Sequence, residues 1–332
     1  MANIYTSITQ LVGKTPLFEI KNYEEKHNLK ARVLVKLEYY NPAQSVKDRI
    51  ALAMIEAAEK DGRLKSGYTI VEVTSGNTGI GLAAFAASKG YKFRVYIADD
   101  VSIERFQIIK AFGGEIIKLS QVPQITKTME ETGGDFMAAI KALKREVLDK
   151  EENIFFTDQS ANTANSGIHE ATTGPEIWVD TDGKVDIFVS NIGTGGTLTG
   201  TGRYLKKQNP SIKIVALEPT PQSLPSKENP KPEQITGVHP FDNMPEEKLP
   251  AILDKSLIDE KFIVDAKEAY KAAREIAKSE GILLGTSGGA SVFAAIELAK
   301  RPENAGKTIV AIAPDTGLRY LSTNLYNPDF PV

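Results

Sequence analysis

A lysine occupies an unusual position in the stretch NPAQSVKDR, which spans residues 41–49. The residues after it, IALAMIEAAEK, form an amphipathic pattern that predicts a helix over 47–61, so Lys47 lies in the first helical turn. The amino end of a helix has partial positive charge, which favours an acidic residue such as Asp48 and disfavours a cation. A neutral lysine amine can act as a base or form a Schiff base with a carbonyl compound. Lys47 is therefore a candidate catalytic residue.

Three turns rich in glycine, serine and threonine could bind an anion. They are TSGNTG at 74–79, GTGGTLTG at 193–200 and GTSGGAS at 285–291, and each follows a predicted strand or apolar run and precedes a predicted helix. Such a turn presents backbone N–H groups and hydroxyls at a helix N-terminus, where a carboxylate or phosphate can bind. Any one of them could simply cap its helix. Three turns at the carboxyl ends of strands, together with Lys47, predict a ligand site.

The second turn favours a phosphate group. Its glycines allow the backbone to approach an anion, and Thr194 and Thr197 add hydroxyl donors. The turn lacks the lysine of the P-loop pattern, and Leu198 stands where the dinucleotide pattern G-x-G-x-x-G has its third glycine. These residues predict a phosphate site without the other requirements of a nucleotide.

Short apolar runs alternate with longer helical patterns along most of the chain. Because the runs are continuously apolar, they predict parallel strands that are covered on both faces. The strand–helix–strand order predicts two open, doubly wound α/β sheets. The predicted strands cover 31–38, 68–73, 93–98, 115–119, 153–156, 186–192, 212–218 and 307–314, and the predicted helices cover 47–61, 79–90, 102–112, 133–149, 197–208, 266–280 and 288–300.

The composition excludes several kinds of site. The 332 residues are enough for two packed domains, and the net charge of −3 gives no indication of a nucleic-acid or anionic membrane partner. The absence of cysteine excludes disulfides, cysteine-based metal sites and thiol nucleophiles, and three widely spaced histidines disfavour a histidine-based metal site. The N-terminus lacks the pattern of a signal peptide, and no apolar stretch approaches the roughly 18 residues of a membrane span. We therefore expect a cytoplasmic protein that binds no metal.

Seven motifs occur along nearly the whole chain in the order found in one enzyme family. The sequence resembles the cysteine synthase (O-acetylserine sulfhydrylase) and cystathionine β-synthase branch of the fold-type II pyridoxal-phosphate enzymes. The motifs are TPL at 15–17, KLEYYNPAQSVKDR at 36–49, VTSGNTGIGLA at 73–83, GPEIW at 174–178, GTGGTLTG at 193–200, GTSGGA at 285–290 and PDTGLRYLST at 314–323. The order of the predicted crossovers places a smaller domain over 43–157 and a larger, cofactor-binding domain over 1–42 and 158–332, and we expect the active site in the cleft between them. The resemblance also implies a homodimer.

The resemblance implies a role for each candidate residue. Lys47 would form a Schiff base with pyridoxal 5'-phosphate, Asn77 would bond the 3'-oxygen of the cofactor, and Ser287 would face its pyridine nitrogen. The cofactor phosphate would lie on the turn made by Gly193, Thr194, Gly195, Gly196 and Thr197. The α-carboxylate of the substrate would be held by Thr74, Ser75, Thr78 and Gln159.

The expected chemistry is replacement of a group on Cβ of an amino acid. Lys47 would remove the α-proton, a leaving group would depart from Cβ, and a nucleophile would add there. A serine at the pyridine nitrogen cannot hold it protonated as a carboxylate would, so Ser287 implies a weaker electron sink that favours prompt elimination. The most direct reaction is synthesis of cysteine from O-acetylserine and sulfide.

The loop over 219–250 departs from the family pattern. His239, Pro240, Phe241 and Asp242 replace its glycine-rich part, which normally faces the substrate side chain. Asp242 is a candidate general base for water or a thiol, and its charge would repel hydrosulfide. This suggests an alternative reaction in which cysteine itself releases sulfide and takes up water or a second thiol, giving serine, lanthionine or cystathionine. A solvated surface position for Asp242 and His239 is the competing interpretation.

Two other functions fit the residues less well. Serine and threonine dehydratases have a lysine motif resembling SFKxRG and an asparagine turn resembling GNHAQ, which this chain lacks. A phosphate-binding or dehydrogenase-like module without chemistry could use the same glycine turns, but it would have no need for Lys47.

Overall fold

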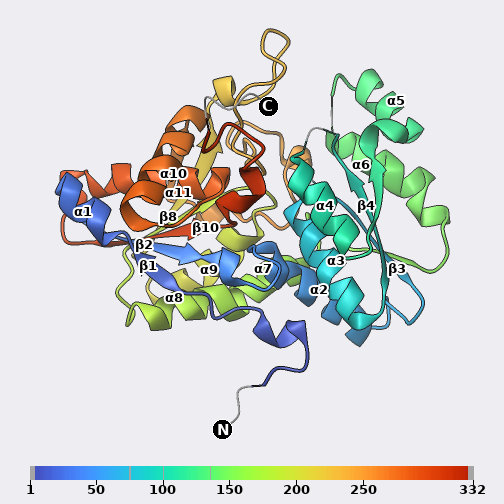
Figure 1. The fold of residues 1–332 in the computed structure, drawn as a ribbon, viewed down its shortest axis with the longest axis horizontal. Coiled ribbons are helices and arrows are strands. Elements are labelled where there is room, and N and C mark those ends of the chain that lie inside the picture. The colour runs from blue at the N-terminus through green and yellow to red at the C-terminus, as the bar shows by residue number, and fades with distance from the viewer. Residues whose placement is uncertain (1–3, 75, 100, 135, 328–332) are drawn as a thin grey trace. The chain divides into compact units, whose positions relative to one another are not determined.

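The computed structural model describes residues 4–74, 76–99, 101–134 and 136–327, and the chain divides into two compact units (Figure 1). The smaller unit contains the residues up to Val12 and Lys47–Ala164, and the larger unit contains Gly13–Val46 and the residues from Asn165 onward. Each unit has its own open sheet, which confirms the predicted α/β class. The smaller unit starts and ends a few residues later than the predicted range 43–157. It also includes the N-terminal segment, because the 3-10 helix Ile8–Leu11 contacts α3 (Asn77–Lys89).

The smaller unit is built on a parallel sheet with the strand order β5-β4-β3-β6. Apolar residues of β3 and β4, among them Val71 and Tyr96, pack against Ile125 of α5 and Leu143 of α6. The strands are β3 (Thr69–Val73), β4 (Lys92–Ile97), β5 (Glu115–Lys118) and β6 (Ile154–Phe156), and the helices are α2 (Lys47–Lys60), α3, α4 (Ile103–Ala111), α5 (Pro123–Glu131) and α6 (Phe136–Glu146).

The larger unit is built on a sheet with the strand order β1-β2-β10-β7-β8-β9. Its strands run parallel except β1, which is antiparallel to β2. The strands are β1 (Leu17–Glu19), β2 (Arg32–Leu37), β7 (Ile187–Asn191), β8 (Lys213–Pro219), β9 (Glu260–Val264) and β10 (Thr308–Ala313). The helices are α1 (Lys21–His27), α7 (Thr163–Ile168), a single turn of π-helix that we call the π-turn (His169–Thr173), α8 (Gly174–Asp180), α9 (Gly196–Gln208), α10 (Ala266–Glu280) and α11 (Thr286–Ala299).

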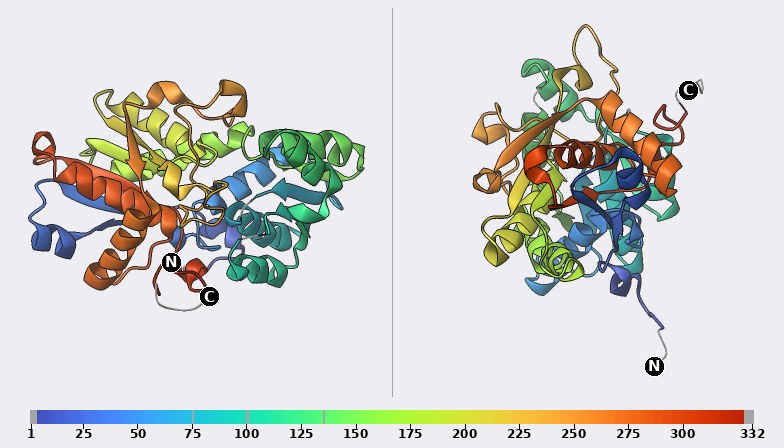
Figure 2. Two further views of the ribbon diagram at one scale, coloured as in Figure 1. Left: turned by 90° about the horizontal axis from the view of Figure 1, so that it is seen from above. Right: turned by 90° about the vertical axis from the view of Figure 1, so that its left-hand side faces the viewer.

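Alternate residues of the central strands belong to two separate cores. Val189 and Ala311 lie in the core that includes residues of α10 and α11, whereas Phe188 and Val310 lie in the core that includes Ile177 of α8 and residues of α9. Figure 2 shows α10 and α11, coloured orange to red, packed side by side on their face of the sheet. Coverage of both faces explains why these strands are continuously apolar in sequence.

The parallel strands bring the first two predicted turns to the carboxyl ends of their sheets. The turn 74–79 follows β3, and the turn 193–200 follows β7. The third turn differs from the prediction, because the preceding run GILL forms only an isolated bridge from Leu284 to Thr316. Among the residues that the structure describes, no helix is both long enough and apolar enough to cross a bilayer.

Candidate functional site

Close packing accounts for the glycines in the turn between β7 and α9. Gly195 has a φ of +78° and forms the N-cap of α9, a conformation that side chains rarely adopt. A Cβ on Gly196 would lie 1.9 Å from Asn165 Oδ1, and one on Gly193 would lie 2.6 Å from the carbonyl oxygen of Gly237. The turn therefore presents its backbone at a helix N-terminus, which is a favourable site for an anion.

The threonine hydroxyls of this turn are oriented by hydrogen bonds. Thr194 Oγ1 accepts from Asn165 Nδ2 at 3.1 Å and from the N–H of Gly196 at 3.4 Å. A hydroxyl that accepts two hydrogen bonds directs its own proton elsewhere, so Thr194 is set up as a donor. Thr197 Oγ1 lies 3.2 Å from His169 Nε2. Asn165 and His169 therefore each contact one of the two threonine hydroxyls.

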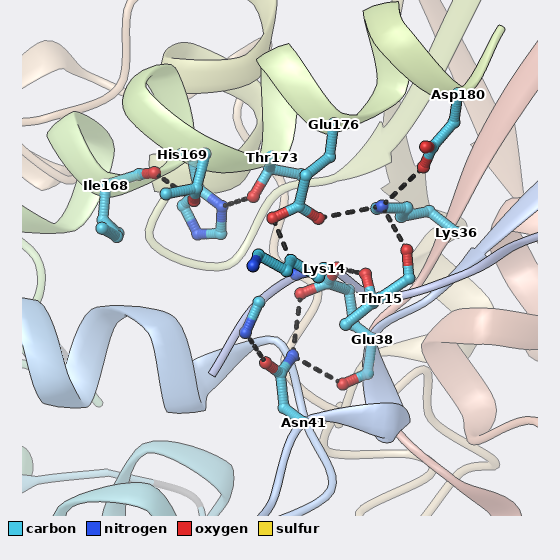
Figure 3. Close-up of polar contacts among 12 residues, drawn as sticks. Lys14, Thr15, Lys36, Glu38, Asn41, Ile168, His169, Thr173, Glu176 and Asp180 are labelled. Carbon is cyan, nitrogen blue, oxygen red and sulfur yellow. Dashed lines mark hydrogen bonds and ion pairs between the residues drawn. The ribbon is translucent and has the colours of Figure 1, made fainter. Parts of the chain in front are cut away.

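Asn165 and His169 were not predicted from the sequence. They lie four residues apart, on α7 and at the start of the π-turn, and both are buried. His169 Nδ1 lies 2.8 Å from Thr173 Oγ1 on the same helical run, as Figure 3 shows. The four-residue spacing is the only sequence signal for this pair, and π-turns are frequent at functional sites.

The second and third turns are joined within the larger unit. Asn191, the last residue of β7, donates from Nδ2 to the carbonyl oxygen of Ser287 at 2.9 Å and to Ser291 Oγ at 2.7 Å. Ser287 is the second residue of α11 and is buried. This contact places the Ser287 end of α11 beside the end of β7.

The altered loop lies against the same two turns. The N–H of Thr236 donates to Thr286 Oγ1 at 3.0 Å, and the N–H of His239 donates to the carbonyl oxygen of Ile192 at 2.9 Å. His239 itself is exposed. His239 therefore lies next to Ile192, the residue just before the glycine turn, with its side chain exposed.

The contacts of Asp242 argue against the predicted base. Asp242 Oδ2 lies 2.5 Å from Lys261 Nζ in an exposed ion pair. The hydrogen bond and charge of Lys261 lower the pKa of the Asp242 carboxyl below its usual range, which makes it a weaker base. Lys261 is 19 residues away on β9, so its pairing with Asp242 could not be read from the loop sequence. We do not assign Asp242 a catalytic role.

The first turn places several predicted residues at the end of β3 in the smaller unit. Thr74 Oγ1 accepts from the N–H of Gly76 at 3.2 Å, and Asn77 is the first residue of α3. A Cβ on Gly76 would lie 2.2 Å from Arg105 Cδ, so only glycine fits there. Ser75 lies outside the described residues.

Gln159 joins this turn from the neighbouring strand. The Thr78 hydroxyl donates to Gln159 Oε1 at 2.6 Å, and Gln159 follows β6, which pairs with β3. Thr74, Thr78 and Gln159 therefore gather at the carboxyl ends of two adjacent parallel strands, the usual ligand position in such sheets.

Lys47 is the first residue of α2, as predicted, and it is partly exposed. A Cβ on Gly81 of α3 would lie 3.1 Å from Ala51 Cβ and 3.3 Å from the carbonyl oxygen of Lys47. Gly81 thus lets α3 approach the first turn of α2. The helix start that presents Lys47 and the helix that begins at Asn77 are close neighbours within one unit.

The segment that leads to Lys47 begins at a buried polar cluster of the larger unit (Figure 3). The Thr15 hydroxyl donates to Glu38 Oε1 at 2.6 Å, and Asn41 Nδ2 donates to the carbonyl oxygen of Glu38 at 2.8 Å. The fully buried Lys36 Nζ lies 2.9 Å from Glu176 Oε2 on α8. Thr15 of TPL and Lys36 and Glu38 of KLE are therefore partners in one polar cluster, which the sequence alone did not indicate.

Comparison with known proteins identifies the family. The chain matches the family described as "Pyridoxal-phosphate dependent enzyme" over residues 8–315. It is 44% identical to a cysteine synthase of Staphylococcus aureus over 324 residues, which is 97% of each chain. It also resembles the solved structure of a hydrogen sulfide-producing enzyme from Fusobacterium nucleatum, with 38% sequence identity and a TM-score of 0.82 over 96% of this chain and 100% of the other. A cysteine synthase structure from Entamoeba histolytica has 38% identity and a TM-score of 0.83, over 99% of this chain and 93% of the other. The chain therefore belongs to the pyridoxal-phosphate-dependent enzymes, as its motifs predicted.

Proposed function

We propose that the protein replaces a group on Cβ of a β-substituted alanine, and that it makes cysteine and acetate from O-acetylserine and sulfide. The observation that carries the proposal is the turn Gly193–Thr197, whose backbone and oriented hydroxyls suit a phosphate monoester at the N-terminus of α9. The cysteine synthases among its relatives supply the reaction type.

The candidate residues fit pyridoxal phosphate. The cofactor phosphate would lie on Gly193–Thr197, Asn77 would bond its 3'-oxygen, and Ser287 would face its ring nitrogen. Lys47 would hold it as a Schiff base. The donors in the turn are neutral N–H and O–H groups, which suit a phosphate that needs no metal ion. When bound, pyridoxal phosphate withdraws electrons and so acidifies the α-proton of an amino acid.

The smaller unit would bind the amino acid. Thr74, Thr78 and Gln159, with Ser75, would hold the α-carboxylate and so orient the bond from Cα to its proton. Lys47 would take that proton. Acetate would then leave from Cβ, hydrosulfide would form the new bond to the same carbon, and Lys47 would return the proton to Cα, which yields cysteine and acetate.

A second candidate is release of hydrogen sulfide from cysteine, followed by addition of water or a thiol. Its support is the similarity to the Fusobacterium nucleatum enzyme and the unusual loop residues 239–242 beside the glycine turn. The exposed ion pair of Asp242 with Lys261 makes Asp242 a weaker candidate for the base of this reaction.

A product assay separates the two reactions. With O-acetylserine and sulfide, we expect cysteine and acetate in equal amounts; with cysteine alone, we expect sulfide release at less than about a tenth of that rate. Chromatography of the amino acids and colorimetric sulfide measurement give both rates. If sulfide release from cysteine is faster than cysteine synthesis, the second candidate is favoured. If the protein shows neither activity, the proposal is wrong.

We further propose that the protein is a cytoplasmic homodimer, as the family resemblance implies. Sedimentation analysis of the purified protein tests the dimer, and fractionation of the source cells tests the location.

Replacement of His169 by leucine is expected to weaken binding of pyridoxal phosphate to the apoprotein by about tenfold, because Thr197 loses the contact that orients its hydroxyl. Pyridoxal, which has no phosphate, should bind the wild type and His169→Leu equally. Equilibrium dialysis of each apoprotein measures both affinities. An equal loss for pyridoxal would mean that the variant disturbs the fold and not the phosphate turn.

A further inference from the structure

Glu72 is a buried carboxylate next to the predicted substrate-binding turn. It is the penultimate residue of β3 and only 2% exposed. A buried carboxylate is unfavourable unless hydrogen-bond donors or a cation compensate for the lost water. Among the described residues, no basic side chain forms an ion pair with Glu72. Its surroundings must therefore stabilise it with donors.

Three donors converge on Glu72. Its Oε2 accepts from the Thr157 hydroxyl at 2.6 Å and from the backbone N–H of Gln159 at 3.0 Å. Its Oε1 accepts from the N–H of Val73 at 2.7 Å. Two of these donors come from the segment after β6, so the side chain links the ends of two strands.

The link connects the two segments that carry the predicted carboxylate-binding residues. β3 and β6 are adjacent parallel strands; Thr74 and Thr78 follow β3, and Gln159 follows β6. The Gln159 amide is oriented at both ends, since Oε1 accepts from Thr78 at 2.6 Å and Nε2 faces the carbonyl oxygen of Val73 at 3.4 Å. A shift of the Gln159 backbone would move this amide relative to the turn.

We infer that Glu72 is a positioning residue for the α-carboxylate of the substrate: by accepting the N–H of Gln159 it fixes the Gln159 side chain relative to Thr74 and Thr78. Glu72 acts through Gln159 and does not touch the amino acid. The inference rests on the proposed function, because it assumes that these residues bind an amino-acid carboxylate. It assigns a purpose to the buried acid within VEVTSG.

The acid–base behaviour of Glu72 provides a separate readout. Burial, with a smaller contribution from Asp158, raises the pKa of Glu72 from 4.5 to about 7. Because the folded protein binds the proton more tightly than the unfolded chain, the contribution of Glu72 to stability is complete below pH 4.5 and is lost as the pH rises to about 7. Hydrogen exchange of the β3 amides should therefore show opening that becomes easier over this range, and Glu72→Gln should flatten that dependence.

Binding of L-alanine tests the positioning role. L-Alanine has the α-amine and α-carboxylate of the substrate but no leaving group on Cβ, so its dissociation constant can be measured from the change in cofactor absorbance of the holoenzyme. The measurement is made at about pH 8.5, where Glu72, with a pKa of about 7, is ionised. Glu72→Gln turns an amide NH2 toward donors that the carboxylate accepts from, and we expect L-alanine to bind about tenfold more weakly. In Glu72→Asp the carboxylate is retained but is one methylene too short to reach Gln159, and the same loss is expected. If Glu72→Gln does not fold, the L-alanine affinity of Glu72→Asp tests the same role.

Two controls separate positioning from general destabilisation. Thr157→Val removes a donor to Glu72 but leaves the contact with Gln159, so L-alanine affinity should change by less than about twofold. In a Gln159→Ala background, Glu72→Gln should weaken L-alanine binding by less than about twofold, because its effect passes through the missing side chain.

The outcomes distinguish this inference from the proposed function. If wild-type holoenzyme shows no absorbance change with L-alanine, the proposed function fails, and the inference fails with it. If the wild type binds L-alanine and the folded Glu72 variants bind it equally well, only the role of Glu72 is wrong. A tenfold loss that persists in the Gln159→Ala background would also overturn the role, because Glu72 would then act by another route.

Discussion

Lys47→Ala is expected to abolish the visible absorbance of the bound cofactor and to lower the rate of β-replacement by about a thousandfold or more. The alanine side chain can neither form a Schiff base nor accept the α-proton. The fold should not suffer, since Lys47 is a partly exposed residue whose charge is unfavourable at the start of α2. Absorbance spectra, the rate of cysteine formation and thermal unfolding of the apoprotein measure the three effects. Borohydride reduction of the wild type, followed by peptide mass analysis, should locate the cofactor on Lys47.

Lys60→Ala is the matched control for this variant. Lys60 is the exposed last residue of the same helix, where a cation is favourable. Its replacement should leave the absorbance band and the activity unchanged and should lower stability slightly. A Lys47→Ala protein that keeps both the band and the activity would contradict the assignment, and it would favour a binding module that uses the glycine turns without chemistry.

Gly200→Ala is expected to destabilise the larger unit by about 1–3 kcal/mol or more and to weaken cofactor binding. A Cβ on Gly200 would lie 2.0 Å from the carbonyl oxygen of Ser166 and 2.8 Å from His169 Cβ, so α9 would have to move away from α7 and the π-turn. That movement would separate Thr194 and Thr197 from Asn165 and His169. Urea unfolding followed by the fluorescence of the single tryptophan, Trp178, reports on this unit directly, because Trp178 packs against the core that α9 shares.

Gly202→Ala provides the opposite expectation in the same helix. The nearest atoms to a Cβ there are side-chain carbons of Leu257 and Ile214 at 3.6 and 3.8 Å, which is ordinary contact. Alanine should stabilise the helix by ~0.5–1 kcal/mol, because glycine loses more backbone entropy on folding. If the two variants unfold at the same urea concentration, the close approach of α9 to α7 does not constrain the turn.

The central strands could be predicted because burial on both faces makes them apolar throughout. All eight predicted strands are present, and their ends differ from the predicted ones by at most one residue. β1 and β9 were missed because they lie at the edges of the sheet, where a strand such as Glu260–Val264 can be polar. α7 and α8 were missed because their sequence, TANSGI to GPEIWVD, has little apolar periodicity. Their role is polar: they supply Asn165, His169 and Glu176.

The site could be predicted only where a residue type is itself unusual. Lys47 at a helix start and the glycine turn at 193–197 are visible in the sequence because each breaks a local preference. The partners His169, Glu72 and Lys36 are not visible, since their roles depend on contacts between segments far apart in the chain. Asp242 shows the opposite case: its sequence position suggested a base, and its contact with Lys261 argues against one.

The helical run from α7 through the π-turn to α8 has a consequence for how the gene can change. Asn165 and His169 contact the threonines of the glycine turn, and Glu176 and Asp180 further along the same run contact Lys36. Deletion of one residue between these pairs would rotate one pair by about 100° relative to the other. A substitution in this run changes the contacts of one residue, whereas a change in its length would misalign both pairs of contacts at once. The length of the stretch 165–180 is therefore constrained at both ends, by the glycine turn on one side and by Lys36 on the other.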